Sequence, residues 1–177
     1  MKKRKKKLIK IGILGGTFDP PHGGHLYIAK MGIKVLKLDK LIWVITKKNP
    51  LKKKPYLTLK KRTKLSKKIT RGEKKITVQY LDDKISSNST FNLLNYLKEK
   101  NKDLKLYFLM GEDSLLKFHK WSKWEKIPKI AKIIIFPRKI KYNKASNKVL
   151  KKFHKRDWAY INSKKINISS SLIRKFW

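Results

Sequence analysis

The sequence GGTFDPPHGGH at residues 15–25 joins an apolar run to an amphipathic segment and so marks a strand-to-helix connection. The run at residues 8–14 is typical of a buried strand, and residues 25–38 carry apolar side chains at helical spacing. Glycines in a strand-to-helix turn let backbone N–H groups approach a polyphosphate, and the start of the helix adds a partial positive charge. The stretch therefore predicts a phosphate-binding turn.

The rest of the chain alternates short apolar runs with helix-length segments. We expect strands at residues 41–46, 76–81, 104–110 and 133–136, and helices at residues 58–69, 91–98, 113–121 and at the C-terminal end, capped by Thr58 for the first and by Ser169 or Ser170 for the last. This alternation predicts an α/β fold, a Rossmann-like, mostly parallel sheet with helices on both faces, in a single domain over residues 1–177. In such a sheet, ligands bind beyond the carboxyl ends of the strands.

Two histidines follow the glycine pair. His22 and His25 are three residues apart at the expected helix entrance, so both imidazoles can face one pocket. The stretch is neither the dinucleotide fingerprint nor a Walker loop. Two other interpretations stay open at this point: a glycine turn with two incidental histidines, or a zinc site with Asp19, His119 or His154 as third ligand.

The charge balance is strongly basic. The 43 lysines and six arginines stand against eleven carboxylates, for a net charge of +38. Such charge favours nucleic-acid binding. The lysines, however, run through every expected element, and arginine, the better reader of phosphate and base edges, is scarce. We therefore expect no dedicated nucleic-acid partner, and keep a lysine-rich nucleic-acid-binding protein as the alternative function from another class.

Several classes of protein are excluded by composition. Without cysteine there is no disulfide framework, thiolate zinc site or cysteine nucleophile. No window approaches the run of about 18 apolar residues that a membrane-spanning helix needs. The basic start leads into an apolar stretch that Lys10 interrupts, which does not fit a signal peptide. We expect a cytoplasmic protein with no membrane partner.

Two motifs at opposite ends of the chain resemble those of one superfamily. The sequence HGGH at residues 22–25 resembles the His-x-Gly-His signature of nucleotidyltransferases, and ISSSLIR at residues 168–174 resembles their second motif. Further segments are similar to the bacterial nicotinate mononucleotide adenylyltransferases, namely NPLK at 49–52, STF at 89–91, MGEDS at 110–114, FHKW at 118–121 and Trp124. The resemblance covers nearly the whole chain.

This resemblance implies a reaction. AMP passes from ATP to nicotinate mononucleotide, which gives nicotinate adenine dinucleotide (deamido-NAD) and pyrophosphate. The attacking phosphate oxygen is already ionised, so catalysis consists mainly of alignment and charge stabilisation. ATP is the co-substrate, and Mg²⁺ is carried by the ATP phosphates without a protein metal ligand. Enzymes that adenylylate nicotinamide mononucleotide or phosphopantetheine stay alternatives, and oligomeric state is left open.

The resemblance also implies the site residues. His22 and His25 hold the triphosphate as catalytic residues. The ATP-binding residues are Gly15, Gly16, Thr17, Phe18, Gly111, Asp113, Ser170, Ser171 and Arg174. The substrate-binding residues are Lys52, for which Lys53 or Lys54 can substitute, Thr90 beside the nicotinate carboxylate, and Trp121 stacked on the pyridine ring. Two positions depart from the family pattern: Ser171 replaces a threonine, and Asn92 an aspartate.

Overall fold

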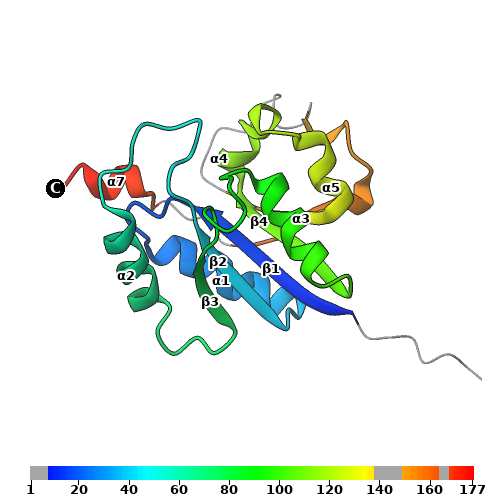
Figure 1. Cartoon of the computed structure of the whole chain (residues 1–177), viewed down its shortest axis with the longest axis horizontal. Helices are drawn as coiled ribbons and strands as arrows, with labels where there is room; N and C mark the ends of the chain where they lie inside the picture. The colour runs from blue at the N-terminus through cyan, green and yellow to red at the C-terminus, as the bar shows by residue number, and fades with distance from the viewer. Residues whose placement is uncertain (1–7, 138–148, 164–167) are drawn as a thin grey trace, which may run out of the picture.

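The computed structural model describes residues 8–137, 149–163 and 168–177, and its centre is one six-stranded sheet (Figure 1). The strand order is β3-β2-β1-β4-β5-β6, and every neighbouring pair is parallel. The strands are β1 (Ile9–Gly16), β2 (Lys40–Ile45), β3 (Ile76–Tyr80), β4 (Leu104–Gly111), β5 (Ala131–Phe136) and β6 (Trp158–Tyr160). The predicted α/β fold with a parallel sheet is confirmed, and β6 is a strand that the sequence analysis missed.

Helices connect the strands. They are α1 (Gly23–Leu36), α2 (Leu59–Ile69), α3 (Thr90–Lys100), α4 (Glu112–Leu115), α5 (Ile127–Ile130) and α7 (Ser170–Arg174), with short 3₁₀ helices η1 (Phe118–Lys120), η2 (Trp124–Lys126) and η3 (Lys155–Asp157). Two predicted caps are confirmed by their hydrogen bonds. Thr58 accepts from the Lys61 backbone N–H at the start of α2, and Ser169 accepts from that of Leu172 at the start of α7.

The expected continuous helix over residues 113–121 is wrong. The chain forms the single turn α4 and then η1, because packing overrides helical spacing in this segment. A 3₁₀ turn places residues i and i+3 on the same side. Phe118 and Trp121 therefore both reach the core side, and their ring centroids lie 5.3 Å apart.

Helices cover both faces of the sheet, as predicted. On one face, α1 packs through Ile28 and Ala29 against β-strand side chains such as Leu109. On the other face, α3 packs through its buried leucines against Phe108 and its neighbours. Figure 1 shows α3 and α5 on the side of the sheet opposite α1. None of the helices within the described part of the chain is long and apolar enough to cross a membrane.

The strand order has a direct consequence for ligand binding. The connection from β1 leads to β2 on one side, whereas β4 lies on the other side of β1. The order therefore reverses between β1 and β4, and in open parallel sheets such a switch point opens a crevice at the carboxyl ends of the strands. The turn at residues 15–25 begins at this position, since β1 ends at Gly16.

Candidate active site

The two histidines lie at the entrance of α1. His22 is the N-cap residue and is buried, with 4% of its surface exposed, while His25 lies in the first helical turn. Their ring centroids are 3.7 Å apart with an interplanar angle of 30°. The backbone N–H of His22 donates to Nδ1 of His25 over 3.3 Å. With Nδ1 accepting this hydrogen bond, the proton of the neutral imidazole lies on Nε2, which makes Nε2 a hydrogen-bond donor.

Gly24 makes room for the His22 ring. A Cβ atom at this position would lie 3.0 Å from Cε1 and Nδ1 of His22 and 2.9 Å from the side chain of Ile168. At neighbouring Gly23, a Cβ would meet nothing within 4 Å. The second glycine of the HGGH motif is therefore a packing requirement, and the first is not.

The Phe18 side chain packs against His25. Its ring is 2% exposed and stacks on Trp43 with centroids 4.5 Å apart, and it meets the edge of His25 at 4.9 Å. Its backbone φ of +49° lies in the left-handed region, which only tertiary packing makes acceptable for an aromatic residue. A nucleotide can reach Phe18 only through its backbone, so the side chain serves His25 rather than a ligand.

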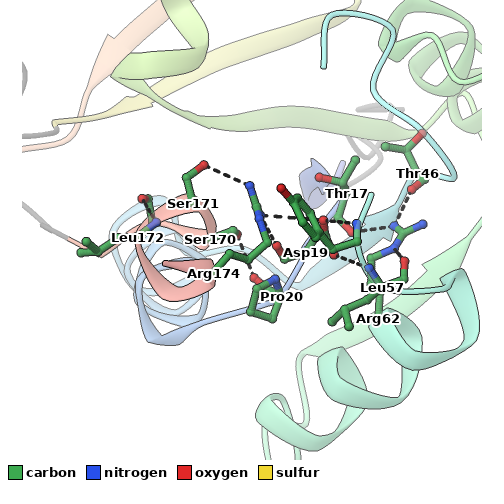
Figure 2. Close-up of polar contacts among 12 residues, drawn as sticks. Thr17, Asp19, Pro20, Thr46, Leu57, Arg62, Ser170, Ser171, Leu172 and Arg174 are labelled. Atoms are coloured by element: carbon green, nitrogen blue, oxygen red, sulfur yellow. Dashed lines mark hydrogen bonds and ion pairs between the residues drawn. The ribbon is translucent and has the colours of Figure 1, made fainter. Parts of the chain in front are cut away.

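The C-terminal motif docks on the same turn (Figure 2). The Ser170 hydroxyl donates to the Pro20 carbonyl over 2.8 Å, and the Arg174 guanidinium donates to the Asp19 carbonyl. Arg174 also donates to the Ser171 hydroxyl over 3.2 Å and lies over the Tyr56 ring. The structure therefore brings predicted site residues of the C-terminal motif onto the turn at residues 15–25, about 150 positions away in sequence.

Asp19 is a buried carboxylate that links α7 to the loop between β2 and α2. It accepts hydrogen bonds from the backbone N–H groups of Tyr56 (2.8 Å) and Leu57 (2.9 Å), and its Oδ2 lies 3.8 Å from Arg174. The sequence analysis listed Asp19 only as an optional zinc ligand. The structure instead gives it a role in joining three segments.

Arg62 is a second residue that the sequence analysis missed. It lies on α2, is 2% exposed, and donates to the backbone carbonyls of Thr17, Thr46, Lys47 and Leu57 (Figure 2). Burial lowers the pKa of its guanidinium, and the negative charges of Asp19 and Asp82 oppose that shift.

The segment after β2 is held from the other side by carboxylates that follow β3. Asp82 accepts from the Thr46 hydroxyl and from the Lys47 backbone N–H, both at 2.7 Å. Next to it, burial and a 2.6 Å hydrogen bond to Asp83 raise the pKa of Tyr80 to about 12. Tyr80 is therefore a protonated donor throughout the physiological range.

The remaining predicted residues lie around the same ends of the strands. Gly111 ends β4 and caps α4, and Asp113 is exposed in that helix. Lys52, Lys53 and Lys54 are all exposed, so the structure does not single out one of them.

Thr90 and Trp121 lie on the α3 side of the sheet. Thr90 is the first residue of α3, and Trp121 is partly buried with its ring 5.8 Å from that of Phe108. The loop before α3 contacts the segment after β2, because the Asn88 side chain donates to the Lys48 carbonyl over 3.1 Å.

The described residues do not form a cluster of zinc ligands. Within residues 8–137, 149–163 and 168–177, which include all four histidines, no group of three or more His, Asp or Glu side chains is arranged to hold a metal ion. The His22 ring lies against the His25 ring, and the His25 ring meets the rings of Phe18 and Trp43 edge to face.

The chain matches one protein family over most of its length. Residues 13–176 match the family model described as Cytidylyltransferase-like. The sequence is 45% identical over 171 residues to a protein of Pelagibacter ubique (strain HTCC1062) described as a probable nicotinate-nucleotide adenylyltransferase. That alignment covers 96% of this chain and 94% of the relative.

Solved structures share the fold. The chain is similar to the Plasmodium falciparum nicotinic acid mononucleotide adenylyltransferase complexed with NaAD, with a TM-score of 0.80 and 27% identity over 95% of this chain and 83% of that chain. The complex of the same protein with APC gives a TM-score of 0.77 and 26% identity, with the same coverage of both chains.

Proposed function

The chain belongs to the cytidylyltransferase-like family, and from this premise we propose that it is a nicotinate-nucleotide adenylyltransferase. It transfers AMP from ATP to nicotinate mononucleotide and releases pyrophosphate. The acceptor is supported by the names of the relatives and by the NaAD complex of the Plasmodium protein. The reaction belongs to NAD biosynthesis. We propose that the protein is cytoplasmic and that a single domain carries the activity.

One observation carries the proposal. The two motifs that define the resemblance meet at the end of β1, where Ser170 and Arg174 of α7 bind the carbonyls of Pro20 and Asp19. The guanidinium, which has further N–H groups to donate, and the imidazoles then surround one turn, together with the positive end of α1. These donors fit a triphosphate, because charge-assisted hydrogen bonds and helix N-termini bind phosphate oxygens.

The bond changes follow from this donor set. An ionised phosphate oxygen of nicotinate mononucleotide attacks the α-phosphorus of ATP and forms the new P–O bond. The bond from the α-phosphorus to the bridging oxygen breaks, and its electrons leave with pyrophosphate. No proton has to be removed from the nucleophile, so a general base is not needed.

The residues of the turn then act by stabilising charge. The proton on Nε2 of His25 is a suitable donor to a phosphate oxygen, because Nδ1 is already engaged by the His22 backbone. We assign the other ATP contacts to Gly15, Gly16, Thr17, the backbone of Phe18, Gly111, Asp113, Ser170, Ser171 and Arg174. We assign the contacts with nicotinate mononucleotide to Lys52, Thr90 and Trp121. Mg²⁺ carried by the ATP phosphates, without a protein metal ligand, would supply positive charge that stabilises the leaving pyrophosphate.

A panel of acceptors tests the proposal. Purified protein is incubated with ATP and Mg²⁺ and with nicotinate mononucleotide, nicotinamide mononucleotide or phosphopantetheine, and pyrophosphate and the dinucleotide product are measured. We expect the highest kcat/KM with nicotinate mononucleotide. Preference for another acceptor would overturn the assignment of substrate, and no transfer to any of them would overturn the assignment of activity.

A further inference from the structure

Arg62 has surroundings that its place on a helix does not require. A helical arginine normally reaches solvent, yet this side chain is 2% exposed in the middle of the α2–sheet contact. Burying a guanidinium is costly unless its donors are paired. The cost is met by four hydrogen bonds of 2.6 to 3.1 Å, all of them to backbone carbonyls.

The four acceptors belong to three different segments. Thr17 is in the turn that leads to the histidines, Thr46 and Lys47 follow β2, and Leu57 lies in the loop that carries Lys52. A guanidinium can join them because its donors spread in a plane from one rigid group, whereas a lysine ammonium donates from a single point.

Asp19 closes this arrangement into a ring. Its carboxylate accepts from the backbone N–H of Leu57 at 2.9 Å, while the Leu57 carbonyl accepts from Nε of Arg62 at 3.1 Å. Thr17, which binds the other side of the guanidinium at 2.6 Å, is two residues before Asp19. Arg62 and Asp19 thus fix the turn and the loop to each other from both sides (Figure 2).

A second chain of contacts continues from Arg62 toward the α3 side. Thr46, whose carbonyl binds Arg62 at 2.8 Å, also donates its hydroxyl to Asp82 at 2.7 Å. Asn88, just before α3, donates to the Lys48 carbonyl at 3.1 Å. The residues after β2 therefore lie between the turn with the histidines and the loop before Thr90.

We infer that Arg62 is a positioning residue that sets the turn at residues 15–25 against the segment at residues 46–57, and thereby aligns the ATP subsite with the acceptor subsite. The assignment of the subsites rests on the proposed function. The positioning itself rests on the hydrogen bonds to four backbone carbonyls. Because the acceptors are backbone atoms, these bonds depend on the Arg62 side chain and not on the side chains of the acceptor residues.

The test compares Arg62→Lys with a control on the same helix. Arg62→Lys keeps the positive charge and removes the planar set of donors. The control, Ile69→Ala, removes apolar contact at the other end of α2, where Ile69 packs against the core. Both variants should lower the melting temperature, so melting temperature alone does not distinguish them.

Three readouts distinguish positioning from stability. They are the Kd for α,β-methylene-ATP, the kcat/KM with nicotinate mononucleotide, and hydrogen exchange of the peptides that cover residues 15–25 and 46–57. For Arg62→Lys we expect weaker analogue binding, faster exchange in both segments, and kcat/KM lowered on the order of 10- to 100-fold, since small displacements of reacting groups have effects of this size. For Ile69→Ala we expect all three to stay at the wild-type value.

The inference is overturned if Arg62→Lys melts at a lower temperature but keeps wild-type analogue binding and exchange in both segments. Should Arg62→Lys not fold, Thr46→Val takes its place, because it removes the Thr46 hydroxyl that donates to Asp82 and leaves that carboxylate only the Lys47 backbone N–H in the segment after β2. It must then increase exchange in residues 46–57 and weaken analogue binding, and wild-type values for both would equally overturn the inference. Analogue binding and exchange need no acceptor, so they report on Arg62 even if wild-type protein fails to use nicotinate mononucleotide.

Discussion

His25 is held as a hydrogen-bond donor by the residue that precedes its helix. The His22 backbone N–H engages Nδ1, so the proton on Nε2 can face a phosphate oxygen. We predict that His25→Ala lowers kcat by about 100-fold or more, which is the effect of losing one donor to developing charge. Pyrophosphate release and circular dichroism measure the activity and the fold. The matched control is His154→Ala, which changes an exposed histidine before η3 and should keep wild-type turnover. Wild-type turnover in His25→Ala would contradict the proposed pocket.

Two adjacent glycines give a sharper test of the same pocket. In Gly24→Ala the new methyl group would lie 3.0 Å from the His22 ring, so the ring must move, and we expect a lower kcat with ATP and nicotinate mononucleotide. In Gly23→Ala the methyl group meets nothing within 4 Å, and alanine favours the helix by up to about 1 kcal/mol. That variant should be fully active and at least as stable in urea unfolding. Equal activity of the two variants would show that the position of His22 does not matter.

Sequence reasoning found the residues whose chemistry is local. The histidine pair, the Thr58 cap and the Ser169 cap follow from short spacings, and the structure confirms the two caps. Arg62 and Asp19 were missed because their partners lie far away in sequence and are mostly backbone atoms. A signal for Arg62 was present: among 43 lysines and six arginines, an arginine within an amphipathic helix marks a position where lysine is not equivalent.

At the scale of elements, α7 depends on its contacts with the turn. A helix of five residues is not stable alone, and Ser170 and Arg174 attach it to Pro20 and Asp19. We predict that Arg174→Met raises the KM for ATP about tenfold, as expected for the loss of hydrogen bonds to a charged group. Lys175→Met is the control, because it removes the same charge from an exposed neighbour and should leave the KM for ATP unchanged. Equal KM values for ATP in both variants would show that α7 does not contribute to ATP binding.

The elements differ in how well their sequences predict them. The runs that became β1, β2, β4 and β5 are apolar enough to identify as buried strands, because both of their faces are covered by helices. By contrast, β6 has three residues and, within the described part of the chain, pairs only with β5 at the sheet edge. The order of the strands was not predictable, since register and switch point arise from tertiary packing. The prediction of a continuous helix after β4 was wrong for the same reason, because Trp121 packs against both Phe108 and Phe118.

At the scale of the whole molecule, the net charge of +38 acts as a field rather than through particular pairs. Eleven carboxylates cannot neutralise 49 lysines and arginines, and two of the carboxylates, Asp19 and Asp82, are engaged in holding the candidate site. Exposed ion pairs such as Lys152–Glu125 add little stability. The electric field of the unbalanced charge therefore extends into solvent, where it attracts any polyanion that approaches the carboxyl ends of the strands.

This field predicts a salt dependence that separates steering from specific binding. We expect the Kd for α,β-methylene-ATP to rise as KCl increases from 50 to 500 mM, because the Debye length falls from above about 10 Å toward about 3 Å and screens the exposed lysines. Isothermal titration calorimetry measures the effect, and adenosine is the control because it has the same base and ribose without charge. Binding of adenosine should not change with salt. If the analogue is as insensitive to salt as adenosine, the lysines do not contribute to nucleotide binding. If a random oligonucleotide binds more tightly than the analogue at every salt concentration, the charge serves nucleic acid instead.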